Sequence, residues 1–74
     1  MEGKQIYNQI LLIFAEILRR ITDKYVMHDL PIPEEVLALK DEACRVASKA
    51  ADERNPDTLA EYEQRLYEIR SALK

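Results

Sequence analysis

The sequence predicts an all-α protein folded as an antiparallel three-helix bundle with up-down-up topology. Apolar residues recur at helical spacing in three segments, two short proline-marked breaks separate these segments, and the segments are similar in length. We place the helices at about 4–27, 33–53 and 56–73. Three such helices joined by short turns are typical of this topology. The chain has 74 residues, so we expect a single domain over 1–74, in which one small core gives only modest stability.

The first predicted helix carries an unusually wide apolar surface. Its apolar residues follow two neighbouring heptad seams, each with the alternating spacing of three and four that packed helices show. The first seam consists of Ile6, Ile10, Ile13 and Ile17, and the second of Tyr7, Leu11, Phe14, Leu18, Ile21 and Tyr25. Together they cover an arc of about 200°, against the roughly 100° or more of an ordinary surface helix. We therefore expect this helix to be the central element of the bundle, and we favour pairing of part of its surface with another chain. The alternative is a monomer in which the helix lies deep between its two neighbours and uses the whole arc.

A connector rich in apolar residues and proline ends the first helix. Each proline pushes the residue before it toward extended geometry, so residues 27–33 cannot be helical throughout. Pro33 and the two glutamates that follow it are typical of a helix start, because proline suits the first helical position and carboxylates favour the positive end of the helix dipole. We expect Leu30 and Ile32 to fold back over the core. The alternative is an exposed loop that binds a peptide.

The second predicted helix has a seam made largely of small residues. The seam consists of Val36, Leu39, Ala43, Val46 and Ala50, and it is widened by Leu37, Cys44, Ala47 and Ala51. Alanines at this density allow a neighbouring backbone to approach closely. We expect tight packing against the first helix, with large residues opposite small ones.

The third predicted helix begins sharply and has a narrow apolar stripe. Asn55 is a good N-cap, Pro56 a good first helical residue, and Asp57 favours the first turn. The stripe consists of Leu59, Tyr62, Leu66, Ile69 and Leu73. The rest of the helix is strongly charged, so we expect it to bury one side only.

The charges indicate a mildly acidic protein. Eleven lysines and arginines stand against fourteen aspartates and glutamates, and the excess of acid lies in the second and third helices. A generic nucleic-acid surface is therefore disfavoured, although a local patch of Lys4, Arg19, Arg20 and Lys24 is conceivable on the first helix. No uncharged run approaches the roughly 18–20 apolar residues of a transmembrane helix. A single cysteine and no secretion signal favour a reducing, cytoplasmic location.

The residues that carry catalysis or hold cofactors do not form a recognisable pattern. The one glycine stands at position 3, so there is no glycine-rich phosphate loop. Cys44 lies among alanines, where a thiol usually behaves as a small apolar core residue. His28 lies in the connector, where we expect a loop or capping role. We therefore predict no enzyme activity, no catalytic residue, no cofactor and no metal site.

The favoured function is that of a small helical protein–protein interaction module: an adaptor, regulator, inhibitor or assembly subunit that acts through an apolar helix face as a homodimer. The predicted interface consists of Tyr7, Leu11, Phe14, Leu18 and Tyr25. One alternative is a nucleic-acid-binding regulator that uses the small basic patch on the first helix. A second alternative is peripheral membrane association through the same helix. A subunit that completes the active site of another protein is also consistent with the sequence.

Overall fold

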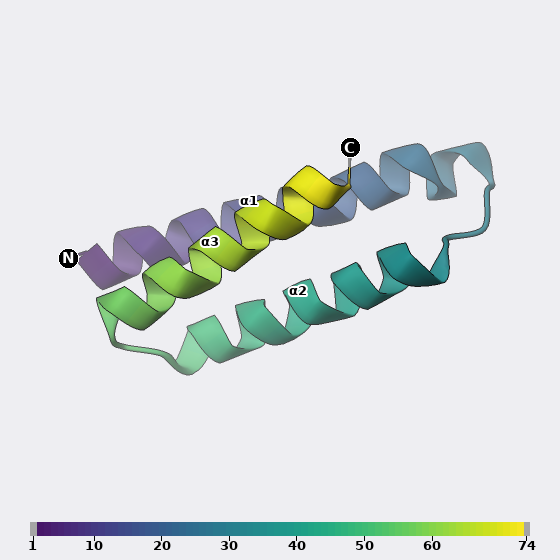
Figure 1. Ribbon diagram of the computed structural model, residues 1–74. Helices are drawn as coiled ribbons and strands as arrows, with labels where there is room; N and C mark the ends of the chain where they lie inside the picture. Colours follow the sequence, from purple (N-terminus) through teal and green to yellow (C-terminus); the bar gives the residue numbers. More distant parts are fainter. Residues whose placement is uncertain (1, 74) are drawn as a thin grey trace.

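The prediction of an all-α chain with three helices is confirmed. A computed structural model describes the backbone of residues 2–73 and the side chains of residues 4–73. The elements are α1 (Glu2–Lys24), a short 3₁₀ turn η1 (Val26–His28), α2 (Glu34–Asp52) and α3 (Pro56–Ala72). The molecule is elongated, with extents of 41 × 18 × 17 Å. In Figure 1 α1 runs away from the N-terminus, α2 returns, and α3 runs back beside α1.

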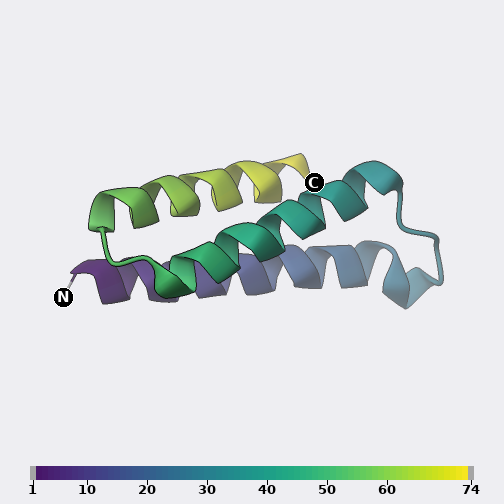
Figure 2. The same cartoon turned by 90° about the horizontal axis from the view of Figure 1, so that it is seen from below.

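All three helices pack on one another, but not equally. The contact between α1 and α3 is the most extensive, that between α1 and α2 is smaller, and that between α2 and α3 is smaller still. Figure 2 shows α2 running obliquely between α3 and α1 in that view and passing in front of part of α1. The two outer helices therefore cover different amounts of α1.

The helix α1 ends in a tight turn, about three residues earlier than we predicted from the sequence. The α-helix ends at Lys24, and the N–H of Leu30 donates to the carbonyl of Tyr25 while the N–H of Asp29 donates to that of Val26. This pair of bonds is the Schellman pattern, in which the residue after the helix takes a left-handed conformation. Asp29 has that conformation, with φ 56°, which aspartate tolerates better than most residues do. At its other end α1 begins at Glu2, two residues before the predicted start.

The connector folds back only in part. Ile32 packs against the core as predicted. The prediction for Leu30 was wrong, because its side chain is 53% exposed. The backbone explains the difference. Leu30 directly follows the left-handed residue, and its N–H is bonded to the carbonyl of Tyr25, just after α1, which holds Leu30 outside the bundle.

The starts of α2 and α3 follow the local signals in the sequence. The prediction made Pro33 the first residue of the helix. Pro33 instead has an extended conformation and is the N-cap, so α2 begins one residue later, at Glu34. The Pro33 carbonyl accepts the N–H groups of Val36 and Leu37 at 3.0 Å. Asn55 is the N-cap of α3, with its side-chain oxygen accepting the N–H of Asp57 at 2.9 Å. These short-range bonds set where each helix begins and therefore which residues face the core.

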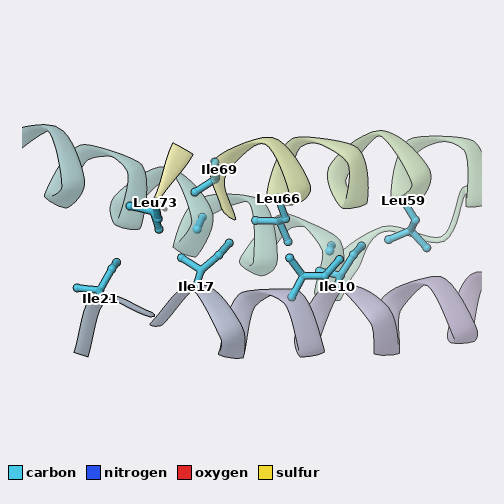
Figure 3. Packing of buried hydrophobic residues seen from close by; sticks show 10 residues of the cluster. Ile10, Ile17, Ile21, Leu59, Leu66, Ile69 and Leu73 are labelled. Atoms are coloured by element: carbon cyan, nitrogen blue, oxygen red, sulfur yellow. The ribbon is translucent and has the colours of Figure 1, made fainter. Parts of the chain in front are cut away.

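The core lies chiefly between α1 and α3. Its buried residues are Ile10, Ile13, Ile17 and Ile21 from α1, Ala43 and Ala50 from α2, and Leu59, Leu66, Ile69 and Leu73 from α3. Figure 3 shows Ile10, Ile17 and Ile21 of α1 pointing toward the leucines and Ile69 of α3. Four of the five residues of the predicted α3 stripe are buried; Tyr62 is half-buried. Each large buried side chain contributes about 1.5–3 kcal/mol of transfer free energy.

Polar contacts close the α1–α3 contact at its edge. A guanidinium N–H of Arg70 donates to the carboxylate of Glu16 at 2.8 Å, and Arg20 donates to the backbone carbonyl of Arg70 at 3.1 Å. The guanidinium of Arg70 also lies 4.9 Å from the centre of the Tyr67 ring. Glu16 and Arg20 stand one turn apart on α1. Both side chains contact α3, because they lie beside the buried isoleucine seam of α1.

Candidate protein interaction surface

The second apolar seam of α1 lies on the side of that helix that faces α2. Near the start of α1, Tyr7 lines a surface depression together with Ala51, and near its end Tyr25 lines another together with Val36. The opposite flank of α1 belongs to α3, where Glu16 contacts Arg70. Because the residues between Tyr7 and Tyr25 follow at heptad spacing, the whole seam runs along α2.

The five predicted interface residues all lie on this flank, and none of them is fully buried. Leu11 is 40% exposed, whereas Tyr7, Phe14, Leu18 and Tyr25 are half-buried. Ile21, which belongs to the same seam, is only 4% exposed and is part of the core. The flank is therefore an incompletely covered apolar surface.

A row of residues on α2 continues this surface. Leu37, Cys44 and Ala51 follow one another at intervals of seven, which keeps them on one side of the helix, and Ala51 is the residue that lies beside Tyr7. Leu37 is 38% exposed, Ala51 is exposed and Cys44 is half-buried. The sequence contained the signal for this row in its heptad spacing, but we had interpreted these residues as a widening of the buried seam.

We call the combined surface the α1–α2 face. It consists of Tyr7, Leu11, Phe14, Leu18 and Tyr25 from α1 and of Leu37, Lys40, Cys44, Ala47 and Ala51 from α2. Lys40 is the one charged member of this set, and it is half-buried. The α1 side carries large side chains and the α2 side mainly small ones, so the face has a ridge beside a shallower strip.

Other exposed apolar side chains lie apart from this face. Leu12 is 59% exposed and stands about 100° around α1 from Leu11, on the side away from α2. Val26, Met27 and Leu30 are 57%, 71% and 53% exposed at the connector end of the bundle. Leu12 is a single exposed residue of the kind that most proteins have.

A charged group joins α2 to α3 on the opposite side of α2. The guanidinium of Arg65 donates to both carboxylate oxygens of Glu42, with one N–O distance of 2.7 Å, and also to Glu68 at 3.1 Å. The hydrogen bond from Arg65 holds the pKa of Glu42 below its ordinary value of 4.5, and the two carboxylates raise the pKa of Arg65. This group joins α2 to α3 through charged hydrogen bonds.

The basic residues of α1 do not form one patch. Lys4 lies near Glu53 and Arg54 at one end of the bundle, whereas Arg20 and Lys24 line a depression with Leu73 at the other end. Arg19 lies 3.8 Å from Asp23, and the ammonium of Lys24 lies 5.7 Å from the centre of the Tyr25 ring. Each cation therefore has protein neighbours of its own.

The part of the chain that the structure describes holds neither a metal-binding group nor a membrane-spanning helix. Within it, no three histidine, cysteine, aspartate or glutamate side chains are placed to hold a metal ion together. None of the described helices combines the length and apolar character needed to cross a bilayer. Cys44 is half-buried, less than we expected for a core thiol, and His28 is exposed.

Comparison with known proteins gives no further assignment. The chain matches no protein-family model, no curated protein and no solved structure.

Proposed function

We propose that the chain is a helical protein–protein interaction module, an adaptor, regulator, inhibitor or assembly subunit, which works as a homodimer through the α1–α2 face. In this proposal the protein is an up-down-up antiparallel bundle with α1 as its central helix. The observation that supports it is that Leu11 and Leu37, on two different helices, are 40% and 38% exposed within one half-buried apolar face. Leu11 lies toward the Tyr7 end of the face and Leu37 at the Tyr25 end, and exposed apolar residues along one face are typical of surfaces that a partner covers.

One long side of the bundle is large enough for a stable dimer interface. A standard protein–protein interface buries about 800 Å² on each partner. The long side of the bundle measures 41 by 18 Å, which is close to that area. A core formed mainly by α1 and α3 leaves a chain of 74 residues with little stability to spare, and burial of the face adds to it at about 25 cal/mol per Å² of apolar surface.

The two alternatives have less support. A nucleic-acid-binding regulator needs a continuous basic surface, but Lys4 lies far from Arg20 and Lys24, and Arg20 donates to the Arg70 carbonyl. Peripheral membrane association needs an exposed apolar face flanked by basic residues. The α1–α2 face contains only Lys40, and aspartates lie beside it on α2.

The test is the solution mass of the purified protein by light scattering, compared for two adjacent substitutions. We expect the wild-type chain to be a dimer at micromolar concentration and Leu11→Glu to be a monomer, because a carboxylate on the face would lose its hydration in the dimer. Leu12→Glu is the matched control, with the same chemical change on the side of α1 away from α2, and it should remain a dimer. Both variants should keep the wild-type helical circular dichroism.

Two results would contradict the proposal. One is a wild-type chain that stays monomeric up to millimolar concentration, and the other is equal behaviour of the Leu11→Glu and Leu12→Glu variants. A change in mass on addition of an arbitrary oligonucleotide, lost as salt is raised, would favour the nucleic-acid alternative.

A further inference from the structure

We infer that α2 is a hinged cover, which opens as a unit while α1 and α3 stay packed together, and that this opening controls the α1–α2 face. The opening does not depend on the proposed function, whereas its control of the face rests on that function. Three features of the structure support the inference: the division of the buried side chains among the helices, the charged group that joins α2 to α3, and the chain segments at the two ends of α2.

The largest fully buried side chains of the described residues all belong to α1 and α3. They are Ile10, Ile13, Ile17, Leu59, Leu66 and Ile69. The same two helices are joined by hydrogen bonds from Arg70 to the Glu16 carboxylate and from Arg20 to the Arg70 carbonyl. Because these contacts do not involve α2, the α1–α3 pair keeps them when α2 moves away.

The helix α2 contributes much less to the core. Its buried residues are Ala43 and Ala50, whose side chains are single methyl groups. Its larger apolar residues keep part of their surface exposed; they are Val36, Leu37, Leu39 and Val46. Apolar burial stabilises in proportion to the area removed from water, so releasing α2 costs less than separating α1 from α3. Regions with little buried apolar surface are the ones that open locally in native proteins.

The charged group that joins α2 to α3 is a weak contact. Arg65 donates to both carboxylate oxygens of Glu42, and the distance from its Nη2 to Oε1 is 2.7 Å. The side chains of Arg65 and Glu42 are 43% and 30% exposed, so water competes for their charges. The contact fixes the position of α2 in the closed chain without preventing its release.

The segments at both ends of α2 supply the hinges. Residues 30–33 before α2 and residues 53–55 after it form neither helix nor strand. In the second segment the carboxylate of Glu53 accepts the N–H groups of Arg54 and Asn55 at 3.0 Å. These bonds lie within the turn, so they persist when α2 moves. Changes of backbone angle in a few residues between elements are sufficient for such a movement.

Opening of α2 removes the α1–α2 face. It takes Leu37, Cys44 and Ala51 away from α1, and it exposes Tyr7 and Phe14, which are half-buried in the closed chain. A dimer that uses the face forms only from the closed chain, so dimerisation and opening exclude each other. The position of α2 therefore regulates the face, and dimerisation in turn holds α2 closed.

Hydrogen exchange at three equally buried helical positions tests the opening. The side chains of Ala43 in α2, Ile17 in α1 and Leu66 in α3 are all 0% exposed, so solvent access in the closed chain does not distinguish them. Mass spectrometry at nanomolar protein concentration measures the exchange of the peptide around each residue. Relative to intrinsic rates, we expect exchange around Ala43 to be at least about tenfold faster than around the other two, because local opening costs less than complete unfolding.

The urea dependence of the same rates separates local opening from unfolding. Exchange around Ala43 should depend less on urea than exchange around Ile17, because opening exposes less surface than unfolding. Equal rates at the three positions overturn the inference. A faster rate around Ala43 that has the full urea dependence overturns it as well.

Two substitutions of neighbouring carboxylates on α2 test the contact with α3. Glu42→Gln should speed exchange around Ala43 by about two- to fivefold and leave Ile17 unchanged, because a partly exposed ion pair stabilises only modestly. Asp41→Asn makes the same chemical change at an exposed position and should leave both rates as in wild type. Parallel changes around Ala43 and Ile17 in Glu42→Gln overturn the inference, because the whole bundle then opens at once. An unchanged rate around Ala43 overturns the role of the Arg65 contact.

Raising the protein concentration tests the control of the face. Exchange around Ala43 should slow by at least about tenfold as light scattering shows the chain becoming a dimer, because only the closed chain dimerises. A dimer in which Ala43 exchanges as fast as in the dilute chain overturns that control. A chain that stays monomeric overturns it together with the proposed function. In both cases the comparison of Ala43 with Ile17 in the dilute chain still decides whether α2 opens.

Discussion

The two flanks of α1 have similar apolar seams but are buried to different extents. Toward α3, Ile10, Ile13 and Ile17 are at most 2% exposed, and Arg70 closes the edge by contacting Glu16 and accepting a bond from Arg20. Toward α2, Leu11 remains 40% exposed and its neighbours in the seam are half-buried. One flank is complete within a single chain, and the other is not.

The difference teaches that the neighbour determines whether an apolar seam is covered. The helix α3 supplies three leucines and Ile69, which are long enough to fill the space beside the isoleucines. The helix α2 supplies only Ala43 and Ala50 to the buried core. An alanine allows close approach but covers little of a large neighbour, so the outer part of the second seam stays accessible.

The largest expected effect comes from shortening a side chain on the closed flank, which is the flank of α1 that α3 covers; the open flank faces α2. Ile17→Ala should lower the free energy of unfolding by about 2–5 kcal/mol, because Ile17 is completely buried and its loss leaves a cavity. Leu18→Ala, one residue further on the open flank, should cost clearly less in the dissociated chain. Urea unfolding at low protein concentration measures both. Equal losses at the two positions would show that the flanks are equally packed.

A smaller effect comes from enlarging the alanines of α2. Ala43→Leu should lower the free energy of unfolding by about 1–3 kcal/mol through overpacking, because Ala43 has no exposed surface. Ala47→Leu, at a half-buried position of the α1–α2 face, should cost less in the monomer but should weaken the dimer. Thermal melting gives the first quantity and light scattering the second. An Ala47→Leu chain that dimerises as well as wild type would break the comparison.

The smallest effect concerns the charged contact that holds α2 to α3. The pKa of Glu42 is lower in the folded chain than its ordinary value of 4.5, because Arg65 donates to its carboxylate. The resulting stabilisation is complete above that ordinary value and is lost as the pH falls through the lower, folded value, where the carboxylate becomes protonated. Because both side chains are only partly buried and water still screens their charges, we expect a melting temperature only slightly lower for Glu42→Gln at neutral pH.

The pH dependence provides the check on that last prediction. The difference in melting temperature between wild type and Glu42→Gln should shrink as the pH is lowered below about 4.5, since the wild-type contact weakens while the variant has no charge to lose. The control is Gln64→Glu, at an exposed position on α3. The difference in melting temperature between this variant and wild type should not shrink in the same way as the pH falls. A constant difference across the acid range would mean that the Arg65 contact does not depend on the charge of Glu42.

Local signals were sufficient to predict where most helices begin and end. The start of α3 could be predicted from Asn55 and the proline after it, because capping interactions act within one turn. The end of α1 was predicted too late, since apolar residues continue through Val26 and Met27 while the backbone already turns at Asp29. Nothing in the apolar pattern distinguishes a last helical turn from a 3₁₀ turn.

The candidate surface could be predicted only in part. The sequence indicated its α1 half, because an arc of about 200° exceeds what one neighbour covers. It did not indicate the α2 half, since Leu37, Cys44 and Ala51 continue a seam that is buried elsewhere. Nor did it indicate that Glu16 and Arg20 contact Arg70, because those partners are about fifty residues apart in the chain.

The sequence by itself determined the three helices, their caps and the apolar stripes that each helix must bury, because these depend on interactions within a few residues. The tertiary structure decided that the core took most of the first α1 seam and only Ile21 from the second. That choice depends on the distance between helix axes and on the size of the facing side chains, which are properties of helix pairs. The pairing of α1 with α3 completed one seam and left the other beside the alanines of α2.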